Sequence, residues 1–548
     1  MNTIMQWAEK AYNMFIRAEK LLYGGLVLLL LWPVWANKYF LTLDGPCHLY
    51  NSTVLLNFWQ GKHVSFFSQF YTLNPHIDPN WFSHLALAGL MYFLPPVLSE
   101  KILVSLYLLC FLFFSRLLIT QLNPQNKLLA FLPFLFVYHH VFQMGFYNFS
   151  YSLAFMVFAW WFFFRYSGRI STFLFVPVLS LILLITYLAH PIGYLLACGS
   201  IGLVLIMGAL AQKEKQWAVL GRQLIAVFIA ALPSFILILY FIMRRVSYSV
   251  QPGDRTFSEL GNSIIHLTSI TNLVSAESPY TTTIFWFMVA LTVIALGYKI
   301  KSRRITGFDA FFIVVIALVV FYFNCPNAIG GAGIVPERLQ IIPFVILPFW
   351  LATANFSKPL QVIIAAGAII LTCCLAIVRI PVYRLTSGAI EEFMSVQQYI
   401  KPESTVLPLS YAHNGKTEDG KPIADKIWLF FHSADYLGAT KPLIMLGNYE
   451  ANTGYFPLLW KREEDPFVHL CDNDGIEAIP PSVVIPEYER ATGKKVDYVI
   501  PLCLDGEFRN HPNTINLFQQ LDSFYTLIYT SPHGRALLYH RKGETPAH

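Results

Sequence analysis

The sequence has few charged residues and few of the features that mark soluble or secreted proteins. Only 13% of its 548 residues are charged, whereas soluble globular proteins carry about 25%. Its eight cysteines show no spacing of the zinc-binding type, and the chain has no internal repeat or low-complexity stretch. This composition excludes a soluble globular protein, a disulfide scaffold and a disordered chain.

Hydrophobic residues are abundant, and acidic residues are unevenly distributed. Hydrophobic residues make up 55% and aromatic residues 16% of the chain, which is typical of lipid-facing and interfacial surfaces. Only 11 of the 32 acids lie in 1–380, and the other 21 lie in 381–548. We therefore predict a transmembrane part at 1–380 and a soluble α/β domain at 381–548. The net charge of +6 indicates basic cytoplasmic helix ends rather than a nucleic-acid partner.

Apolar runs of about 20 residues predict transmembrane helices. The expected fold is an α-helical polytopic membrane protein with about 11 crossings. A shorter apolar stretch at 80–97 is broken by Pro95 and Pro96. The candidate crossings lie near 21–41, 99–120, 127–144, 149–166, 172–188, 191–211, 217–243, 282–300, 308–325, 339–355 and 359–380.

Basic residues predict the orientation of these crossings. If 80–97 does not cross, Lys127, Arg165 and the basic cluster at 299–304 all fall on the cytoplasmic side. If it does cross, the positive-inside rule is violated throughout. We therefore expect 80–97 to lie in the outer interface of an inner or plasma membrane. The N-terminus is then cytoplasmic and the C-terminal domain extracytoplasmic.

Two outer loops, 42–98 and 244–281, are long in this topology. The first contains a helical pattern with Leu49 and Val54 on one face and Asn51 and Ser52 on the other, as in helices that lie along the interface. In the C-terminal domain, Cys471 and Cys503 are candidates for a disulfide. There we expect helices at 387–400 and 427–437, strands at 405–411 and 497–503, and a hairpin of strands 524–530 and 536–540.

Candidate catalytic residues lie in the first outer loop. Asp44 directly follows the first crossing and precedes a Gly45-Pro46 turn, with His48 close behind. It is either a solvated loop carboxylate or a general base or metal ligand facing a membrane-borne substrate. His76 and Asp78 lie between prolines, and for them a site role and an ordinary interfacial loop are equally favoured.

Further candidates lie on later outer turns. An arginine at the outer end of a helix breaks the positive-inside pattern, and phosphate binding is a physical reason for one. We assign that role to Arg338, supported by Arg255 and Arg245. The alternative for Arg338 is a contact with Glu337 or with lipid headgroups. For His139, His140 and His190, a position at the membrane interface is the more frequent explanation. The other outer-face candidates are His139, His140, Asn148, His190 and Glu337, and a glycine-rich segment at 330–333 precedes Glu337.

This arrangement resembles the GT-C superfamily of integral-membrane glycosyltransferases, which take sugars from polyprenyl-phosphate carriers. The resemblance covers the whole architecture, from the acid after the first crossing to the outer C-terminal domain. It implies that Asp44 is the catalytic base or metal ligand and that Arg338, in Pro336-Glu337-Arg338-Leu339, contacts the lipid-linked phosphate. Many members carry a second acid beside the first, where this chain has Gly45.

The predicted function is an inverting glycosyl transfer on the extracytoplasmic face, in the context of the cell envelope. Asp44 would deprotonate the acceptor hydroxyl, Arg338 would stabilise the phosphate, and His48 or His76 would orient substrates. The expected partners are a lipid-linked sugar donor, membrane lipids and a glycan, lipid or protein acceptor. A divalent cation, Mg or Mn, is the one cofactor considered. A transporter or flippase of lipid-linked precursors and a non-catalytic scaffold of envelope glycan assembly are the alternatives.

Overall fold

The computed structural model describes residues 2–212, 216–245, 250–303, 305–329, 333–471, 475–504 and 506–543. The chain is 66% helical and divides into two compact units. Helices α1 (Asn2–Ala36), α5 (Pro96–Leu122) and α15 (Lys358–Met394) have residues in both units. The first unit comprises Met1–Trp32, Ser105–Gln143 and Tyr147–Val378, and the second comprises Pro33–Val104, Met144–Phe146 and Arg379–His548. Residues 330–332 of the predicted glycine-rich segment lie outside the described residues.

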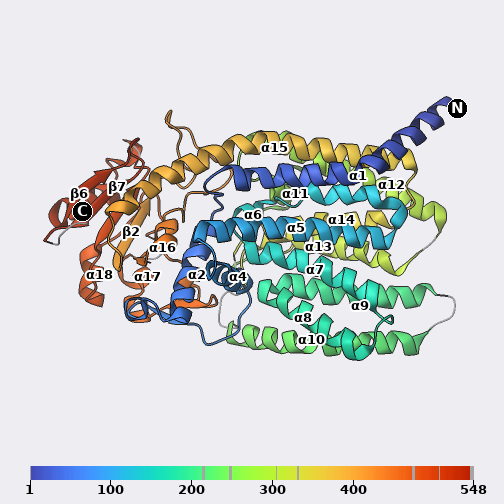
Figure 1. Ribbon diagram of the computed structural model, residues 1–548, viewed down its shortest axis with the longest axis horizontal. Coiled ribbons are helices and arrows are strands. Elements are labelled where there is room, and N and C mark those ends of the chain that lie inside the picture. The colour runs from blue at the N-terminus through green and yellow to red at the C-terminus, as the bar shows by residue number, and fades with distance from the viewer. Residues whose placement is uncertain are drawn as a thin grey trace. The chain divides into compact units, whose positions relative to one another are not determined.

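The first unit is a bundle of long apolar helices. Helix α8 packs between α7 and α10, and α13 packs on α14 (Figure 1). Short 3-10 turns and short helices connect the long ones. Its elements after α5 are η1 (Pro124–Leu135), α6 (His140–Gln143), α7 (Tyr147–Tyr166), α8 (Thr172–Ala189), α9 (Pro191–Ala211), α10 (Trp217–Arg245), α11 (Phe257–Ile265), η2 (Thr268–Ile270), η3 (Ser275–Glu277), α12 (Ser278–Ser302), η4 (Gly307–Asp309), α13 (Ala310–Tyr322) and α14 (Val335–Ala352).

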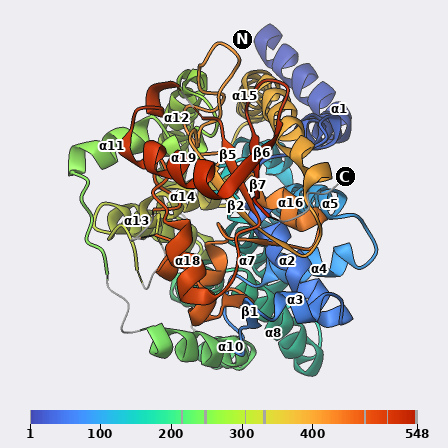
Figure 2. The same ribbon diagram turned by 90° about the vertical axis from the view of Figure 1, so that its left-hand side faces the viewer.

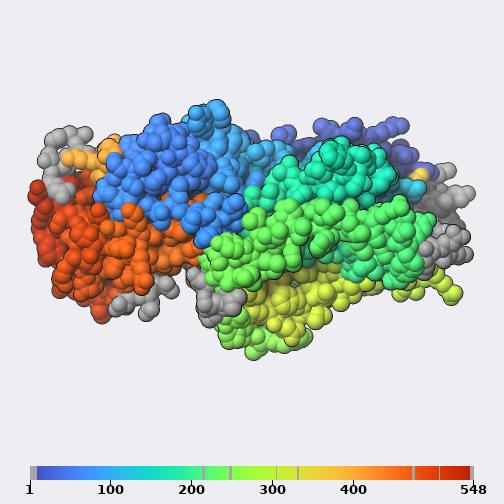
Figure 3. Space-filling view, turned by 90° about the horizontal axis from the view of Figure 1, so that it is seen from below, coloured from blue at the N-terminus to red at the C-terminus, as the bar shows by residue number. Residues whose placement is uncertain are grey.

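Seven helical segments of the described residues are long and apolar enough to cross a membrane. Helix α10 also exposes large apolar side chains such as Phe228, Ile229 and Ile236. Figure 3 shows the surface of the first unit to which this helix, in green, belongs. Apolar surface of this extent requires lipid contact. The protein is therefore an integral membrane protein. The seven segments are Pro96–Leu122, Thr172–Ala189, Pro191–Ala211, Trp217–Arg245, Ser275–Ser302, Val335–Ala352 and Lys358–Tyr399.

The remaining predicted crossings differ from these seven. Stretches 21–41, 149–166 and 308–325 fall largely on α1, α7 and α13, which are helical but are not among the seven. The prediction of an α-helix at 127–144 is wrong, because η1 is a 3-10 helix, and its Pro133 cannot donate to an α-helical ladder. Helix α4 (Phe82–Met91) has 10 residues and rises about 15 Å, so it is too short to cross a membrane. The expected position of 80–97 in the outer interface stays a prediction.

The second unit contains a five-stranded sheet with the strand order β3-β2-β5-β7-β6. Strand β2 (Ser404–Ser410) runs parallel to β3 (Leu443–Met445) and β5 (Tyr498–Leu502). Strands β6 (Tyr525–Thr530) and β7 (Leu537–Arg541) form the predicted antiparallel hairpin. Helix α19 (Pro512–Phe524) contacts β6 (Figure 2). The unit's other elements are η5 (Ser395–Tyr399), α16 (Asp435–Thr440), η6 (Glu450–Asn452), η7 (Arg462–Glu464), α17 (Pro466–His469), α18 (Ile485–Thr492) and η8 (Gly506–Phe508).

The stretch 42–98, which we predicted as the first outer loop, belongs to the same unit as this sheet. It contains α2 (Gly45–Gln60), α3 (Val64–Phe67) and β1 (Tyr71–Leu73), and β1 pairs antiparallel with β4 (Leu458–Trp460). Helix α2 packs on α16 and α4. The polar face of α2, which we expected at the membrane interface, is instead buried, with Asn51 and Ser52 at most 1% exposed. Buried polar side chains need hydrogen-bond partners, and for Asn51 these partners lie in the C-terminal domain.

In the C-terminal domain one predicted helix is largely absent, and the disulfide that we considered possible is not formed. Residues 427–434 form turns, and the helix begins only at Asp435. The reason is local, because the side chain of Asn414 donates to the carbonyl of Ile427 and so takes an acceptor that a helix would use. Cys471 and Cys503 are present as thiols and not as a disulfide, since the fold does not bring their sulfur atoms to bonding distance.

Candidate functional site

The candidate site lies at one edge of the parallel part of the sheet. Strands β2, β3 and β5 are parallel, so their carboxyl ends share an edge, where open α/β sheets bind ligands. Glu450 follows β3 closely and is fully buried. Helices α2 and α4 bring His48 and His84 to Glu450. The site therefore combines segments separated by about 400 positions in the chain.

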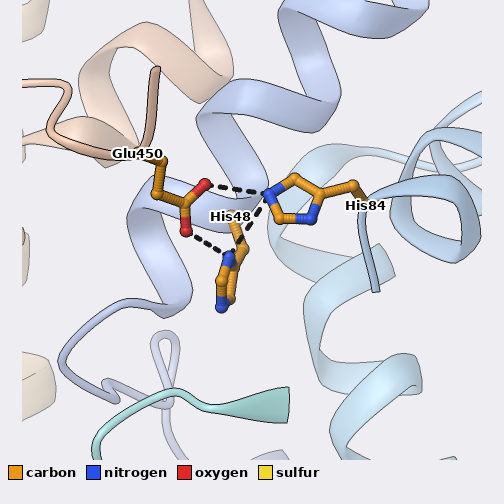
Figure 4. Close-up of side chains that lie close together, drawn as sticks. All are labelled: His48, His84 and Glu450. Carbon is orange, nitrogen blue, oxygen red and sulfur yellow. Dashed lines mark hydrogen bonds and ion pairs between the residues drawn. The ribbon is translucent and has the colours of Figure 1, made fainter. Parts of the chain in front are cut away.

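His48, His84 and Glu450 face one another in a buried cluster, which we call the His–His–Glu cluster. His84 Nε2 lies 2.8 Å from Glu450 Oε2 and 3.3 Å from His48 Nδ1. His48 Nδ1 forms an ion pair with Glu450 Oε1. Figure 4 shows both rings and the carboxylate pointing toward one another. These three residues form a group that could hold a metal ion.

Neighbouring polar groups fix the orientation of the cluster. The ring of His48 contacts the Gly145 carbonyl through Nε2 at 2.9 Å. Asn51 donates to Glu450 Oε2 at 2.9 Å and to Asn448 Oδ1 at 3.0 Å. Burial alone would raise the pKa of Glu450, but the nearby charges of His48 and His84 hold it at about 2. The carboxylate is therefore ionised at neutral pH.

Asp44 occupies the N-cap position of α2 without capping the helix. An N-cap Asp commonly accepts a backbone N–H of the first turn, but the Asp44 side chain makes no such bond. Its Oδ1 lies 3.8 Å from His432 Nε2, and Tyr449 hydrogen-bonds to its side chain. Burial raises the pKa of Asp44 to about 7 and lowers that of His432 to about 3. A carboxylate with these surroundings has the properties of a general base.

Asp435 and Cys47 complete the buried polar cluster. Burial raises the pKa of Asp435 to about 7, and the charges of Glu450 and Asp44 add to the effect. The Cys47 thiol lies 3.4 Å from the Asn448 side-chain oxygen. Burial raises the pKa of this thiol well above its usual value, so Cys47 is not an activated nucleophile. Three carboxylates, those of Asp44, Asp435 and Glu450, are thus buried close together.

Gly145 is required where a turn packs against Asp44. It has a φ of +84°, and a Cβ at this position would lie 2.5 Å from the Asp44 nitrogen. Gly420 has a similar φ of +80° with open space around it. We expect Gly145→Ala to lower the free energy of unfolding by at least about 2 kcal/mol more than Gly420→Ala, because only the former adds a clash to the backbone strain. Thermal unfolding of the purified variants measures this difference, and equal losses would contradict it.

His76 and Asp78 take part in a local loop structure. Asn74 donates to Asp78 Oδ2 at 3.2 Å, and its own side-chain oxygen accepts the backbone N–H of His76 at 3.0 Å. Asp78 is buried, whereas His76 is partly exposed. Neither residue belongs to the His–His–Glu cluster. These contacts are local, so the interfacial-loop interpretation and a catalytic role for the two residues both stay predictions.

The predicted phosphate-binding arginines lie in the first unit and differ in their surroundings. Arg255 forms an ion pair with Glu337, so its charge is balanced. Arg338 Nη1 lies 3.3 Å from His190 Nε2, while His190 Nδ1 accepts the backbone N–H of Ile192. A neutral imidazole has only one acceptor nitrogen, so the ring cannot accept both contacts. The ring of His190 therefore does not accept a hydrogen bond from Arg338 while it accepts one from Ile192.

Of the other predicted residues of the first unit, Arg245, His139 and Asn148 are buried and His140 is partly buried. Arg245 lies with its guanidinium over the ring of Phe241, 5.7 Å from the centroid. His139 accepts the backbone N–H of Phe142 at 3.0 Å, which is a local structural contact. Asn148 is buried at the start of α7, beside the turn that carries His140. Their proposed roles in substrate binding stay predictions.

Comparisons with known proteins identify the architecture. No family model and no curated protein matches the sequence. Among solved structures, ArnT from Cupriavidus metallidurans bound to undecaprenyl phosphate matches with a TM-score of 0.52 at 12% identity, over 95% of this chain and 98% of that one. ArnT in the apo state matches with the same score and identity, over 96% and 98%. The chain has the GT-C fold.

A third match is weaker, and all of them share little sequence with this chain. The oligosaccharyltransferase AglB from Archaeoglobus fulgidus, in complex with an inhibitory peptide and a dolichol-phosphate, matches with a TM-score of 0.47 at 12% identity, over 97% of this chain and 75% of that one. At such identity a structural match shows the fold alone. The resemblance expected from the sequence is confirmed at the level of the GT-C fold.

Sequence reasoning missed most of the polar residues around Asp44 in this GT-C fold. Glu450, His432 and Asp435 lie in the C-terminal domain, to which we assigned no site residue, and His84 lies on the stretch expected at the interface. A polar residue that directly follows a predicted buried strand is a candidate site residue, and this pattern would have identified Glu450. We predicted no strand there, because β3 has only three residues.

Proposed function

We propose that this protein is a GT-C glycosyltransferase that moves a sugar from a polyprenyl-phosphate carrier to an acceptor on the extracytoplasmic face of the membrane. The observation that carries the proposal is the placement of Asp44 in a chain with the GT-C fold. Its carboxylate lies at the start of the first outer helix, is not used to cap that helix, and is buried beside His432 and Tyr449.

Asp44 acts as the general base in this proposal. The acceptor hydroxyl transfers its proton to the Asp44 carboxylate, and its oxygen attacks the anomeric carbon opposite the phosphate. The bond between that carbon and the phosphate oxygen breaks, so the carrier leaves as polyprenyl phosphate and the anomeric configuration inverts. A phosphate leaves without a general acid if a cation stabilises its charge. Only one catalytic carboxylate is then needed, which agrees with Gly45 in place of a second acid.

Arg338 and an apolar groove supply the elements that a lipid-linked donor requires. The groove has a volume of about 430 Å³ and lies among α11, α12, α13 and α14, and small-molecule sites commonly enclose about 300–1,000 Å³. Leu339 and Gln340, which directly follow Arg338 on α14, line it. In this arrangement the phosphate would contact the guanidinium of Arg338, and the prenyl chain would pack against the apolar walls of the groove.

Filling the groove should impair donor binding. Val289 on α12 lines the groove, whereas Ile294 on the same helix does not. We expect Val289→Trp to raise the KM for the polyprenyl-phosphate donor at least tenfold, because the indole occupies the volume of the prenyl chain. Ile294→Trp, a change of similar size at a partly exposed position, should leave the KM nearly unchanged. Equal KM values for the two variants would contradict this location of the lipid.

Proteoliposomes supplied with a panel of polyprenyl-phosphate sugars test the proposed function. A glycosyltransferase releases free polyprenyl phosphate when a membrane extract provides acceptors. A flippase moves the intact donor between leaflets without cleaving it, and a scaffold does neither. Mass spectrometry of the lipids, combined with a leaflet-accessibility assay, distinguishes the three. Intact donor throughout, for every sugar and extract tried, would contradict the proposal.

A further inference from the structure

The donor atoms of the His–His–Glu cluster lie as close together as the ligands of one metal ion. With ligand bonds of about 2.05 Å, a tetrahedral site places neighbouring donor atoms about 3.3 Å apart, and an octahedral site places them about 2.9 Å apart. His48 Nδ1 and His84 Nε2 are 3.3 Å apart. Glu450 Oε2 lies 2.8 Å from His84 Nε2, which is near the octahedral value, and a shift of the carboxylate of about 0.5 Å would bring this distance to the tetrahedral value.

The ring of His48 has the second hydrogen bond that is common around metal ligands. A ligating histidine commonly donates its second ring N–H to a carbonyl, which orients the ring and leaves a lone pair on the other nitrogen. His48 Nε2 has this contact with the Gly145 carbonyl. Asn51 holds Glu450 in place through Oε2. Glu450 is fully buried, and its Oε1 is paired with His48 Nδ1.

The local charge also favours a cation. Asp44 and Asp435 are buried near Glu450, and several buried carboxylates without a cation repel one another. Two neutral imidazoles and one carboxylate carry a single negative charge, so a divalent ion bound to them leaves one positive charge facing the neighbouring acids. Imidazole ligands suit zinc, whereas magnesium and manganese prefer oxygen ligands.

We propose that His48, His84 and Glu450 bind one zinc ion. Among the residues that the structure describes, the group has three ligands, so the fourth position is open to water or another small ligand, as in His₂Glu zinc sites that do chemistry. The ion joins α2, α4 and the segment after β3, which are three separate parts of the second unit. This set differs from the sequence-based prediction of Mg or Mn at Asp44, which stays a prediction.

Zinc binding is tested on the full-length protein, purified in detergent without a polyhistidine tag. The protein is stripped with a chelator and titrated with zinc in competition with a chromophoric chelator. We expect one zinc per chain, with affinity at least 100-fold weaker in His84→Ala and Glu450→Gln. Asn51→Ala, which removes a group that orients Glu450, should weaken binding about 10- to 100-fold. Less than half a zinc per folded chain, or equal affinity in His84→Ala, would overturn the proposal.

His63→Ala is the matched control. His63 also pairs with a glutamate, Glu403, at 2.6 Å, but this pair is exposed and does not belong to the His–His–Glu cluster. Its substitution should leave the zinc affinity unchanged. If His63→Ala weakens zinc binding as much as His84→Ala, the assignment of the ligands is wrong. Size-exclusion profiles of all variants show whether the loss of zinc reflects a lost ligand or an unfolded chain.

Cobalt substitution provides a second measurement that needs no variant to fold. Co²⁺ in a four-coordinate site absorbs visible light much more strongly than in an octahedral one. We expect the stripped wild-type protein to acquire this intense absorption at one cobalt per chain and to lose it when zinc is added. A weak octahedral spectrum, or preferential uptake of manganese, would overturn the zinc assignment. Because no substrate is used, failure here leaves the proposed glycosyl transfer untouched.

Discussion

Replacing Asp44 with Asn should lower the rate of glycosyl transfer about 10²- to 10⁴-fold, the usual contribution of a general base. The amide has almost the same size as the carboxylate, and Asp44 makes no side-chain cap that the substitution could break. Folding and donor binding should therefore persist. Release of polyprenyl phosphate under saturating donor measures kcat, and binding of polyprenyl phosphate alone measures whether the donor site is intact.

Asp465→Asn is the control for this variant. Asp465 is also a buried N-cap residue, and its side chain accepts the backbone N–H of Phe467. Asn caps helices as well as Asp does, so the variant should transfer sugar at the wild-type rate. Full transfer by Asp44→Asn, or an equal loss in both variants, would rule out Asp44 as the base.

Replacing Arg338 with Ala should have the second largest effect, with a loss of about 10²- to 10³-fold in kcat/KM for the lipid-linked donor. The guanidinium would stabilise the phosphate both in the bound donor and as it leaves. Arg338→Lys keeps the charge but loses the planar bidentate contact, so it should recover only part of the activity. Steady-state kinetics over a range of donor concentrations give kcat and KM separately, and so distinguish a loss of donor binding from a loss of stabilisation of the leaving phosphate.

Arg255→Ala provides the comparison for Arg338. The Arg255 charge is already balanced by Glu337 in an exposed ion pair, and such pairs contribute little. We therefore expect less than a tenfold loss of kcat/KM, although both arginines were predicted from the sequence as phosphate ligands. A loss in Arg255→Ala that equals or exceeds the loss in Arg338→Ala would contradict the assignment of Arg338 to the phosphate.

Much of the fold could be predicted because membrane helices and alternating strands leave strong local signals. Long apolar runs predicted α5, α8, α9, α10 and α12, and alternation predicted the β6–β7 hairpin. The same reasoning failed for η1, where a continuous apolar run forms a 3-10 helix whose side chains are largely buried within the protein. Hydrophobicity alone does not distinguish a lipid-facing helix from one surrounded by protein.

The candidate site could be predicted only where its residues are close in the sequence. Asp44 and His48 are four positions apart at the start of one helix, so a local motif was enough to connect them. Glu450 reaches the same place only through the crossover from β2 to β3 and the packing of α2 on α16. We expected the polar face of α2 at the membrane interface because its local sequence pattern does not show that residues about 400 positions later cover it.

The central claim is that Asp44 performs chemistry on a lipid-linked sugar. The most direct test measures free polyprenyl phosphate released from a polyprenyl-phosphate sugar by the wild-type protein and by Asp44→Asn side by side. Donor binding is measured in the same samples. We expect both proteins to bind the donor and only the wild type to release polyprenyl phosphate at an appreciable rate. Equal release by the two proteins would contradict it.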